Sequence, residues 1–164
     1  MPDLAAVLKA IHALVGVWFM AGLIGRWVAL AQAARVSDIP SLRAMLLVSS
    51  RFERLVITGS MAVTVLGVAT AIAQGRPFLG PLQGARFDWL FASVVLVVSV
   101  LPLIPLVFVP RGRLFEAALE EAASVGSVTD RLRLAFRDPM VFAAHVYELG
   151  AMTVVFLLMI LKPF

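Results

Sequence analysis

Four long apolar runs constrain this chain more than any other feature of its sequence. A helix needs roughly 20 apolar residues to cross a hydrocarbon core of about 30 Å. Stretches of that kind occupy about residues 4–30, 55–73, 89–109 and 140–161. Each is a continuous apolar run, unlike the alternating pattern of a barrel strand. The sequence therefore predicts an all-α fold, in which residues 1–164 form a single four-span transmembrane domain packed as an up-down-up-down four-helix bundle.

The composition agrees with a membrane protein and excludes several other classes. Hydrophobic residues make up 62% of the chain and charged residues only 15%, far from the balance of a soluble domain. The net charge is +4, but the arginines lie at the ends of apolar runs instead of forming basic stripes. We therefore expect the lipid bilayer as a partner, and no nucleic acid. Without cysteine, the chain has no disulfide and no Cys-ligated zinc or iron–sulfur site.

The distribution of cationic residues predicts the orientation in the membrane. Ten of them lie at the first and third connections between spans: Arg26, Arg35, Arg43, Arg51, Arg54, Arg111, Arg113, Arg131, Arg133 and Arg137. The remaining four are Lys9, Arg76, Arg86 and Lys162. Cytoplasmic connections carry the excess of Lys and Arg. We therefore expect a multi-pass membrane protein with both termini outside.

The connections carry their own signals. Ser37 or Asp38 can cap a helix that extends the second span into the interface. The third connection contains a short helix-forming segment, residues 114–123, which we expect in water or on the lipid headgroups. Within the third span, Pro102 and Pro105 each remove a helical hydrogen bond, which predicts a bend.

One histidine lies inside the first span, on a stripe with two basic residues. Lys9, His12, Gly16 and Arg26 fall near one helical face. In one interpretation, His12 binds a metal or haem iron, or carries a proton, and Gly16 leaves room for a flat ligand. In the other, His12 hydrogen-bonds to a neighbouring helix while Lys9 and Arg26 reach to the two membrane surfaces. A charge at mid-bilayer costs about 2.5 to 3.5 kcal/mol, so we expect each ionisable residue inside a span to have a bonding partner or a function.

A second pair of ionisable residues lies in the fourth span. His145 and Glu148 are three positions apart and share a face, which suits proton handling. Alternatively, Glu148 pairs with Arg51 or Arg54 near the inner surface and fixes helix packing. No metal centre is expected at this pair, because a di-iron site would need a second motif of the same kind and more acidic residues in the other spans. The heights of His12 and His145 differ by roughly 15 Å, too far for both to bind one iron.

The segments LKAIH…W…AGLIGR, PRGRLFEAALEEAASVG and LLMILKPF resemble the family of predicted bacterial four-helix integral membrane proteins called domain of unknown function 2269. The resemblance covers essentially the whole chain. It implies a location in the bacterial inner (cytoplasmic) membrane and implies no activity.

A more distant resemblance, through the pattern K-x-x-H-x5-W-x2-AGL, is to the membrane protoporphyrinogen oxidase and copper-resistance membrane protein families. It implies that His12 is linked to haem or porphyrin, with haem b as the cofactor. It also implies that Arg26 corresponds to the arginine at the end of the first helix in those families. The oxidase family has Trp-Leu-x-x-Lys at the start of the third helix, where this chain has Ala92 or Ser93 in place of the lysine.

Three functions fit these features. The first is a non-enzymatic accessory subunit or assembly factor, whose partner is another membrane protein or a second copy of the chain. The second is a haem- or porphyrin-associated redox protein that uses His12, with His145 and Glu148 handling protons. The third is a small metal or solute transporter with methionine as a soft ligand. The methionines considered are Met20, Met152 and Met159.

Overall fold

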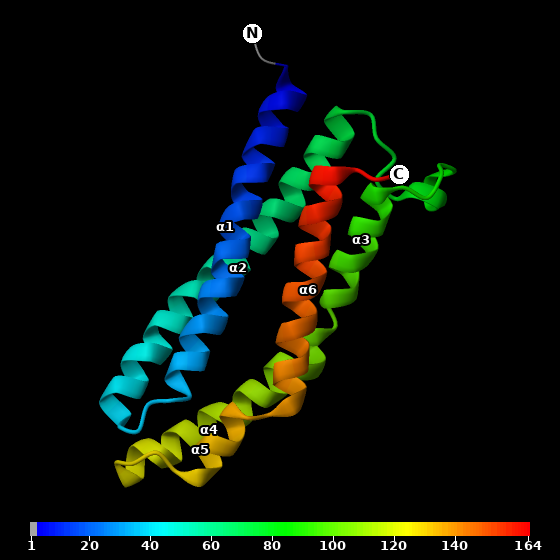
Figure 1. The fold of residues 1–164 in the computed structure, drawn as a ribbon. Helices are drawn as coiled ribbons and strands as arrows, with labels where there is room; N and C mark the ends of the chain where they lie inside the picture. The colour runs from blue at the N-terminus through cyan, green and yellow to red at the C-terminus, as the bar shows by residue number, and fades with distance from the viewer. Residues whose placement is uncertain (1–2) are drawn as a thin grey trace.

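The computed structural model describes residues 3–164, and these form helices and connections without any strand (Figure 1). The all-α prediction is therefore confirmed. The elements in chain order are α1 (Leu4–Ala33), α2 (Ile39–Ala73), the 3-10 helix η1 (Gly80–Gln83), α3 (Trp89–Val100), the π-helix η2 (Ile104–Phe108), α4 (Val109–Val125), α5 (Asp130–Phe136) and α6 (Pro139–Leu161). Within the described residues, four helical stretches are long and apolar enough to cross a membrane.

The long helices form two hairpins. Helix α1 packs along α2, and α3 packs along α6, while α1 also contacts α6 (Figure 1). The start of α1, the α2–α3 connection and the end of α6 lie at one end of the molecule. The α1–α2 connection, α4 and α5 lie at the other (Figure 1). At 1.5 Å per residue, the 30 residues of α1 and the 35 of α2 are about 45 and 52 Å long, so both exceed the hydrocarbon core.

Four glycines bring α1 and α2 together, and we call this contact the glycine seam. Each glycine lies opposite a side chain of the other helix. The pairs are Gly25 with Phe52, Gly22 with Val56, Gly59 with Phe19, and Gly67 with His12. The residue numbers of the two members add to nearly the same total in every pair, as expected of antiparallel helices with a constant register. Without a Cβ at these positions, the two backbones approach closely.

The third helical stretch is interrupted at its prolines. Pro102 and Pro105 have no N–H to donate, so α3 ends just before them and η2 follows. The two carbonyls that lose a helical donor find another one. The Val98 carbonyl accepts from the Leu101 N–H, and the Leu101 carbonyl accepts from the Ile104 N–H, each at 3.2 Å. These carbonyls are therefore already bonded within the chain, and the break serves to redirect the helix.

The third connection is more helical than the sequence indicates. The predicted segment 114–123 is part of the longer helix α4, and the prediction missed the separate helix α5. Thr129 caps α5 by accepting from the Leu132 N–H at 3.3 Å. Helices α4 and α5 pack on the end of the α1–α2 hairpin that carries its connection. The hydrophobic core of this contact consists of Ala33, Ile39, Leu42, Ala118, Ala122 and Leu132. The bundle therefore has a packed helical cap at this end.

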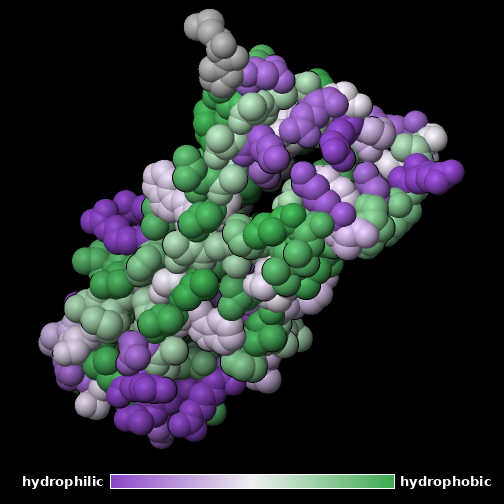
Figure 2. Space-filling view, turned by 45° about the horizontal axis from the view of Figure 1, so that its top comes forward, coloured by the Kyte–Doolittle hydropathy of each residue, from purple (hydrophilic) through white to green (hydrophobic). Residues whose placement is uncertain are grey.

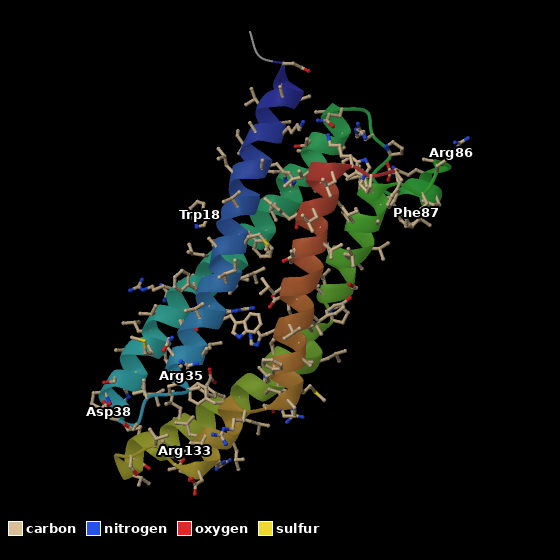
Figure 3. The ribbon with its side chains drawn as sticks, viewed as in Figure 1. Trp18, Arg35, Asp38, Arg86, Phe87 and Arg133 are labelled. Carbon is tan, nitrogen blue, oxygen red and sulfur yellow. The ribbon has the colours of Figure 1, made fainter. Side chains whose placement is uncertain are left out.

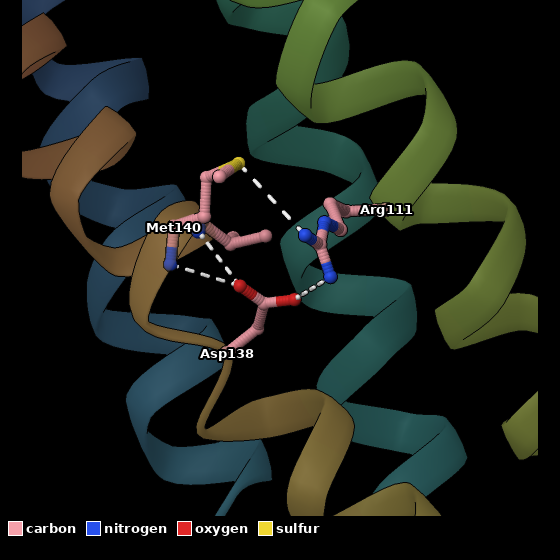
Figure 4. A network of polar contacts seen from close by, with 4 residues as sticks. Arg111, Asp138 and Met140 are labelled. Carbon is pink, nitrogen blue, oxygen red and sulfur yellow. Dashed lines mark hydrogen bonds and ion pairs between the residues drawn. The ribbon is translucent and has the colours of Figure 1, made fainter.

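An ion pair joins the start of α4 to the start of α6. The Arg111 guanidinium donates to Asp138 at 3.0 Å, and Asp138 also accepts from the backbone N–H of Met140 (Figure 4). Asp138 is thus the N-cap of α6 as well as the partner of a cation.

Of the two predicted caps of α2, the structure uses Asp38. Its carboxylate accepts from the Ser41 N–H at 2.9 Å, and this bond holds the pKa of Asp38 below its ordinary value. Asp38 lies with Arg35 and Arg133 at the cap end of the molecule, whereas Arg86 and Phe87 lie at the opposite end (Figure 3). Hydrophilic side chains gather toward the ends of the visible surface and apolar side chains cover much of its middle (Figure 2).

Candidate functional site

Arg26 of α1 is buried between three helices and is only 6% exposed. One terminal nitrogen donates to Glu53 of α2 at 2.9 Å, and the other donates to Glu148 of α6. We call these three residues the Arg26 cluster. A single guanidinium therefore links both helices of the first hairpin to the second hairpin, in the two-pronged geometry that arginine is suited to.

The partners in this cluster differ from those the sequence suggested. Glu148 pairs with Arg26, and not with Arg51 or Arg54, which are both exposed. Arg26 is also enclosed by the bundle, whereas one of the two interpretations of its stripe has the side chain extending outward.

Glu53 is the member of the cluster that the sequence analysis missed. It lies in the segment RFERL, between two arginines, where a carboxylate is expected to face water. The signal that could have revealed it is helical spacing: Glu53 lies one turn from Ser49 and close to one turn from Val56, both of which are buried.

An aromatic ring forms one wall of the cluster. The guanidinium carbon of Arg26 lies 5.8 Å from the centroid of the Phe108 ring. The His145 ring lies 4.9 Å from the same centroid, tilted by 42°. Phe108 is the last residue of η2, so the break caused by the two prolines places this ring. His145 and Glu148 thus lie in one neighbourhood, with Arg26 between the aromatic wall and the carboxylates.

The Arg26 side chain keeps one buried donor without a partner. Its Nε atom has no hydrogen-bond acceptor among residues 3–164. Buried polar groups are nearly always hydrogen-bonded, so this donor is an exception among the buried side chains of residues 3–164.

His12 occupies a separate position, in the glycine seam. Its Nδ1 atom lies 3.0 Å from the Val63 carbonyl of α2, and because a carbonyl only accepts, Nδ1 is the protonated nitrogen. Its ring rests on Gly67, where an added Cβ would lie 3.0 Å from Cε1. Gly16 faces the side chain of Val63, 3.8 Å from its ideal Cβ position. His12 thus makes the predicted bond to a neighbouring helix.

The two histidines belong to different sites. Residues 12 and 26 of α1 are about 21 Å apart along the helix axis, and His145 lies beside the ring that Arg26 contacts. The methionines are also divided. Met20 and Met152 belong to the hydrophobic cluster around Phe19, and Met159 belongs to a separate hydrophobic cluster around Trp89. Within residues 3–164, no group of three or more His, Cys, Asp or Glu is arranged to hold a metal ion.

Comparison with known proteins places the chain in a family. Residues 6–163 match the profile of the family described as "Predicted integral membrane protein (DUF2269)". No curated protein and no solved structure matches the chain, so the more distant resemblances to the oxidase and copper-resistance families gain no support here. The match spans nearly the whole length of the chain and agrees with the four long apolar helices. The chain therefore belongs to the DUF2269 family of predicted integral membrane proteins.

Proposed function

We propose that this integral membrane protein is a non-enzymatic accessory subunit or assembly factor of the bacterial inner membrane. The observation that carries the proposal is the Arg26 cluster, whose charged groups bind one another and join the two hairpins. Such contacts hold helices in a fixed arrangement. The large apolar side chains that remain exposed, such as Trp18 and Phe142, then contact lipid or the helices of a partner.

Purification from the native membrane tests this role. We expect the tagged protein, cross-linked in the membrane before mild solubilisation, to carry a second polypeptide or a second copy of itself at a fixed ratio. Native mass spectrometry measures that ratio. A cross-linked sample that contains only the single chain would overturn the accessory role.

A second candidate is binding of haem or porphyrin at His12, with Gly16 one turn along the same helix. Arg26, which the resemblance links to such a site, lies about 21 Å further along α1 in the Arg26 cluster and takes no part in this candidate. The observation that favours it is the Nδ1 bond to Val63, because it leaves Nε2 unprotonated and holds the ring as metal-binding histidines are usually held. When bound, haem b would supply one-electron chemistry. His145 and Glu148 would then handle protons at some distance from it.

The same purified sample decides this second candidate. After expression with haem precursor, a Soret absorption band near stoichiometric occupancy is expected if His12 is a ligand. His12→Ala should abolish the band, and His145→Ala should leave it, because the two histidines lie in different sites. A flat spectrum of the folded wild type would rule the haem role out.

The orientation can be tested because the chain has no cysteine. The excess of arginine at the cap end supports termini outside and the cap inside. We expect Gln83→Cys, in the α2–α3 connection, to react with a membrane-impermeant maleimide on intact spheroplasts. Ser127→Cys, between α4 and α5, should react only after permeabilisation. The reversed labelling pattern would contradict this orientation.

A further inference from the structure

The Arg26 cluster contains more negative than positive charge. With all three side chains ionised, one guanidinium faces two carboxylates, so the net charge is −1. Glu148 lies about 13 Å from the start of α6 and about 20 Å from its end, which places it well inside the span. An uncompensated charge is costly there, and two carboxylates that share one site do not both ionise readily.

We propose that the Arg26 cluster binds one proton within the membrane, and that Glu53 and Glu148 share it. With this proton bound, the cluster holds one cation, one carboxylate and one neutral carboxyl group, and is electrically balanced. The proton comes from a hydronium ion: its O–H bond breaks, leaving a water molecule, as the O–H bond of the carboxyl group forms. This proposal does not depend on any partner protein.

Exposure identifies the carboxyl group at which the proton enters and leaves. The Glu53 side chain is 46% exposed and the Glu148 side chain is 11% exposed. Exchange therefore takes place at Glu53, while Glu148 stays enclosed by Arg26. The Nε atom of Arg26 is a buried donor without a partner in the same side chain that bonds both carboxyl groups. A water molecule that accepts from Nε can carry the proton to or from the cluster.

The other groups around the cluster do not supply the missing positive charge. Helix α1 contributes Arg26, α2 contributes Glu53, and η2 contributes the uncharged ring of Phe108. Arg51 and Arg54 flank Glu53 on α2, but both are exposed, and neither belongs to an ion pair within residues 3–164. Helix α6 contributes His145 in addition to Glu148, but the imidazole lies against the ring that the Arg26 cation already occupies. A second positive charge there would be repelled by the guanidinium. The proton therefore belongs on a carboxyl group.

Infrared spectroscopy of the full-length protein in lipid nanodiscs tests the proposal. At neutral pH the wild type should show the carbonyl stretch of a protonated carboxyl group. Glu53→Gln and Glu148→Gln should each abolish the whole band, because Arg26 then faces a single carboxylate that it balances. The control Glu121→Gln, which removes an exposed partner of Arg131, should leave the band unchanged.

Each alternative gives a different spectrum. If the band disappears in only one of the two glutamine variants, the proton belongs to that residue alone and is not shared. If the folded wild type shows no such band, the cluster holds no carboxyl proton. Dicyclohexylcarbodiimide, which reacts with protonated carboxyl groups in membranes, provides a test that needs no variant to fold. Mass spectrometry should find it on Glu53 of the wild type, and unmodified Glu53 would overturn the assigned route.

Discussion

Replacing Arg26 with leucine is expected to lower the free energy of unfolding by about 3 to 5 kcal/mol. The substitution removes the only cation bonded to Glu53 and Glu148 in the structure and leaves both carboxyl groups without their donor. It also removes the link between the two hairpins. The loss can be measured by reversible unfolding in mixed micelles, with helix content followed by circular dichroism.

Arg51→Leu is the matched control, since it removes an arginine of similar size that is exposed on α2. It should change stability by less than about 1 kcal/mol. Adding Glu53→Leu and Glu148→Leu to Arg26→Leu should restore much of the lost stability, because buried ion pairs are often replaceable by apolar groups of similar volume. Equal stability of the two single arginine variants would show that the Arg26 cluster does not hold the bundle together.

Gly25→Ala is expected to destabilise the α1–α2 hairpin by about 1 to 3 kcal/mol. An ideal Cβ at this position would lie 2.4 Å from the Phe52 ring, so either the ring or the helix must move. The same unfolding measurement reports the loss. Gly150→Ala in α6 is the control, because nothing lies within 4 Å of its added Cβ. That variant should be as stable as wild type or slightly more so, given the higher helix propensity of alanine.

A double variant shows whether the clash is the cause. Phe52→Ala removes the ring that meets the new methyl group. Combined with Gly25→Ala, it should cost less than the sum of the two single changes, because the two residues are in contact. Purely additive losses would mean that Gly25 matters for some reason other than its approach to Phe52.

Much of the fold follows from the sequence because apolar run length, capping residues and prolines act locally. The four runs predict four long helices, and Asp38 marks the start of α2 because its side chain satisfies a free N–H there. Pro102 and Pro105 predict the interruption after α3, because the missing donors are a property of those residues alone. None of these inferences needs knowledge of which helices are neighbours.

The candidate site was harder to predict, because it depends on contacts between distant segments. Helical periodicity gives the face on which a residue lies, but not the helix that covers that face. Periodicity therefore leaves two interpretations of Glu148, proton handling with His145 or pairing with Arg51 or Arg54, and its observed partner lies on α1. One interpretation likewise has Arg26 reaching to a membrane surface, whereas its side chain is buried against α2 and α6. The roles of His12, Gly16, His145 and Glu148 in ligand binding or proton handling remain predictions.

The order of the cluster along the chain bears on how the protein enters the membrane. Glu53 is synthesised soon after Arg26 and lies on the helix that packs directly along α1, whereas Glu148 comes from the last helix. The arginine therefore has a counterion as soon as the first hairpin has been made. The glycine seam is also complete at that stage, because all of its residues belong to α1 and α2. The first hairpin can thus insert as a unit with its charge already compensated, and Glu148 joins when α6 follows.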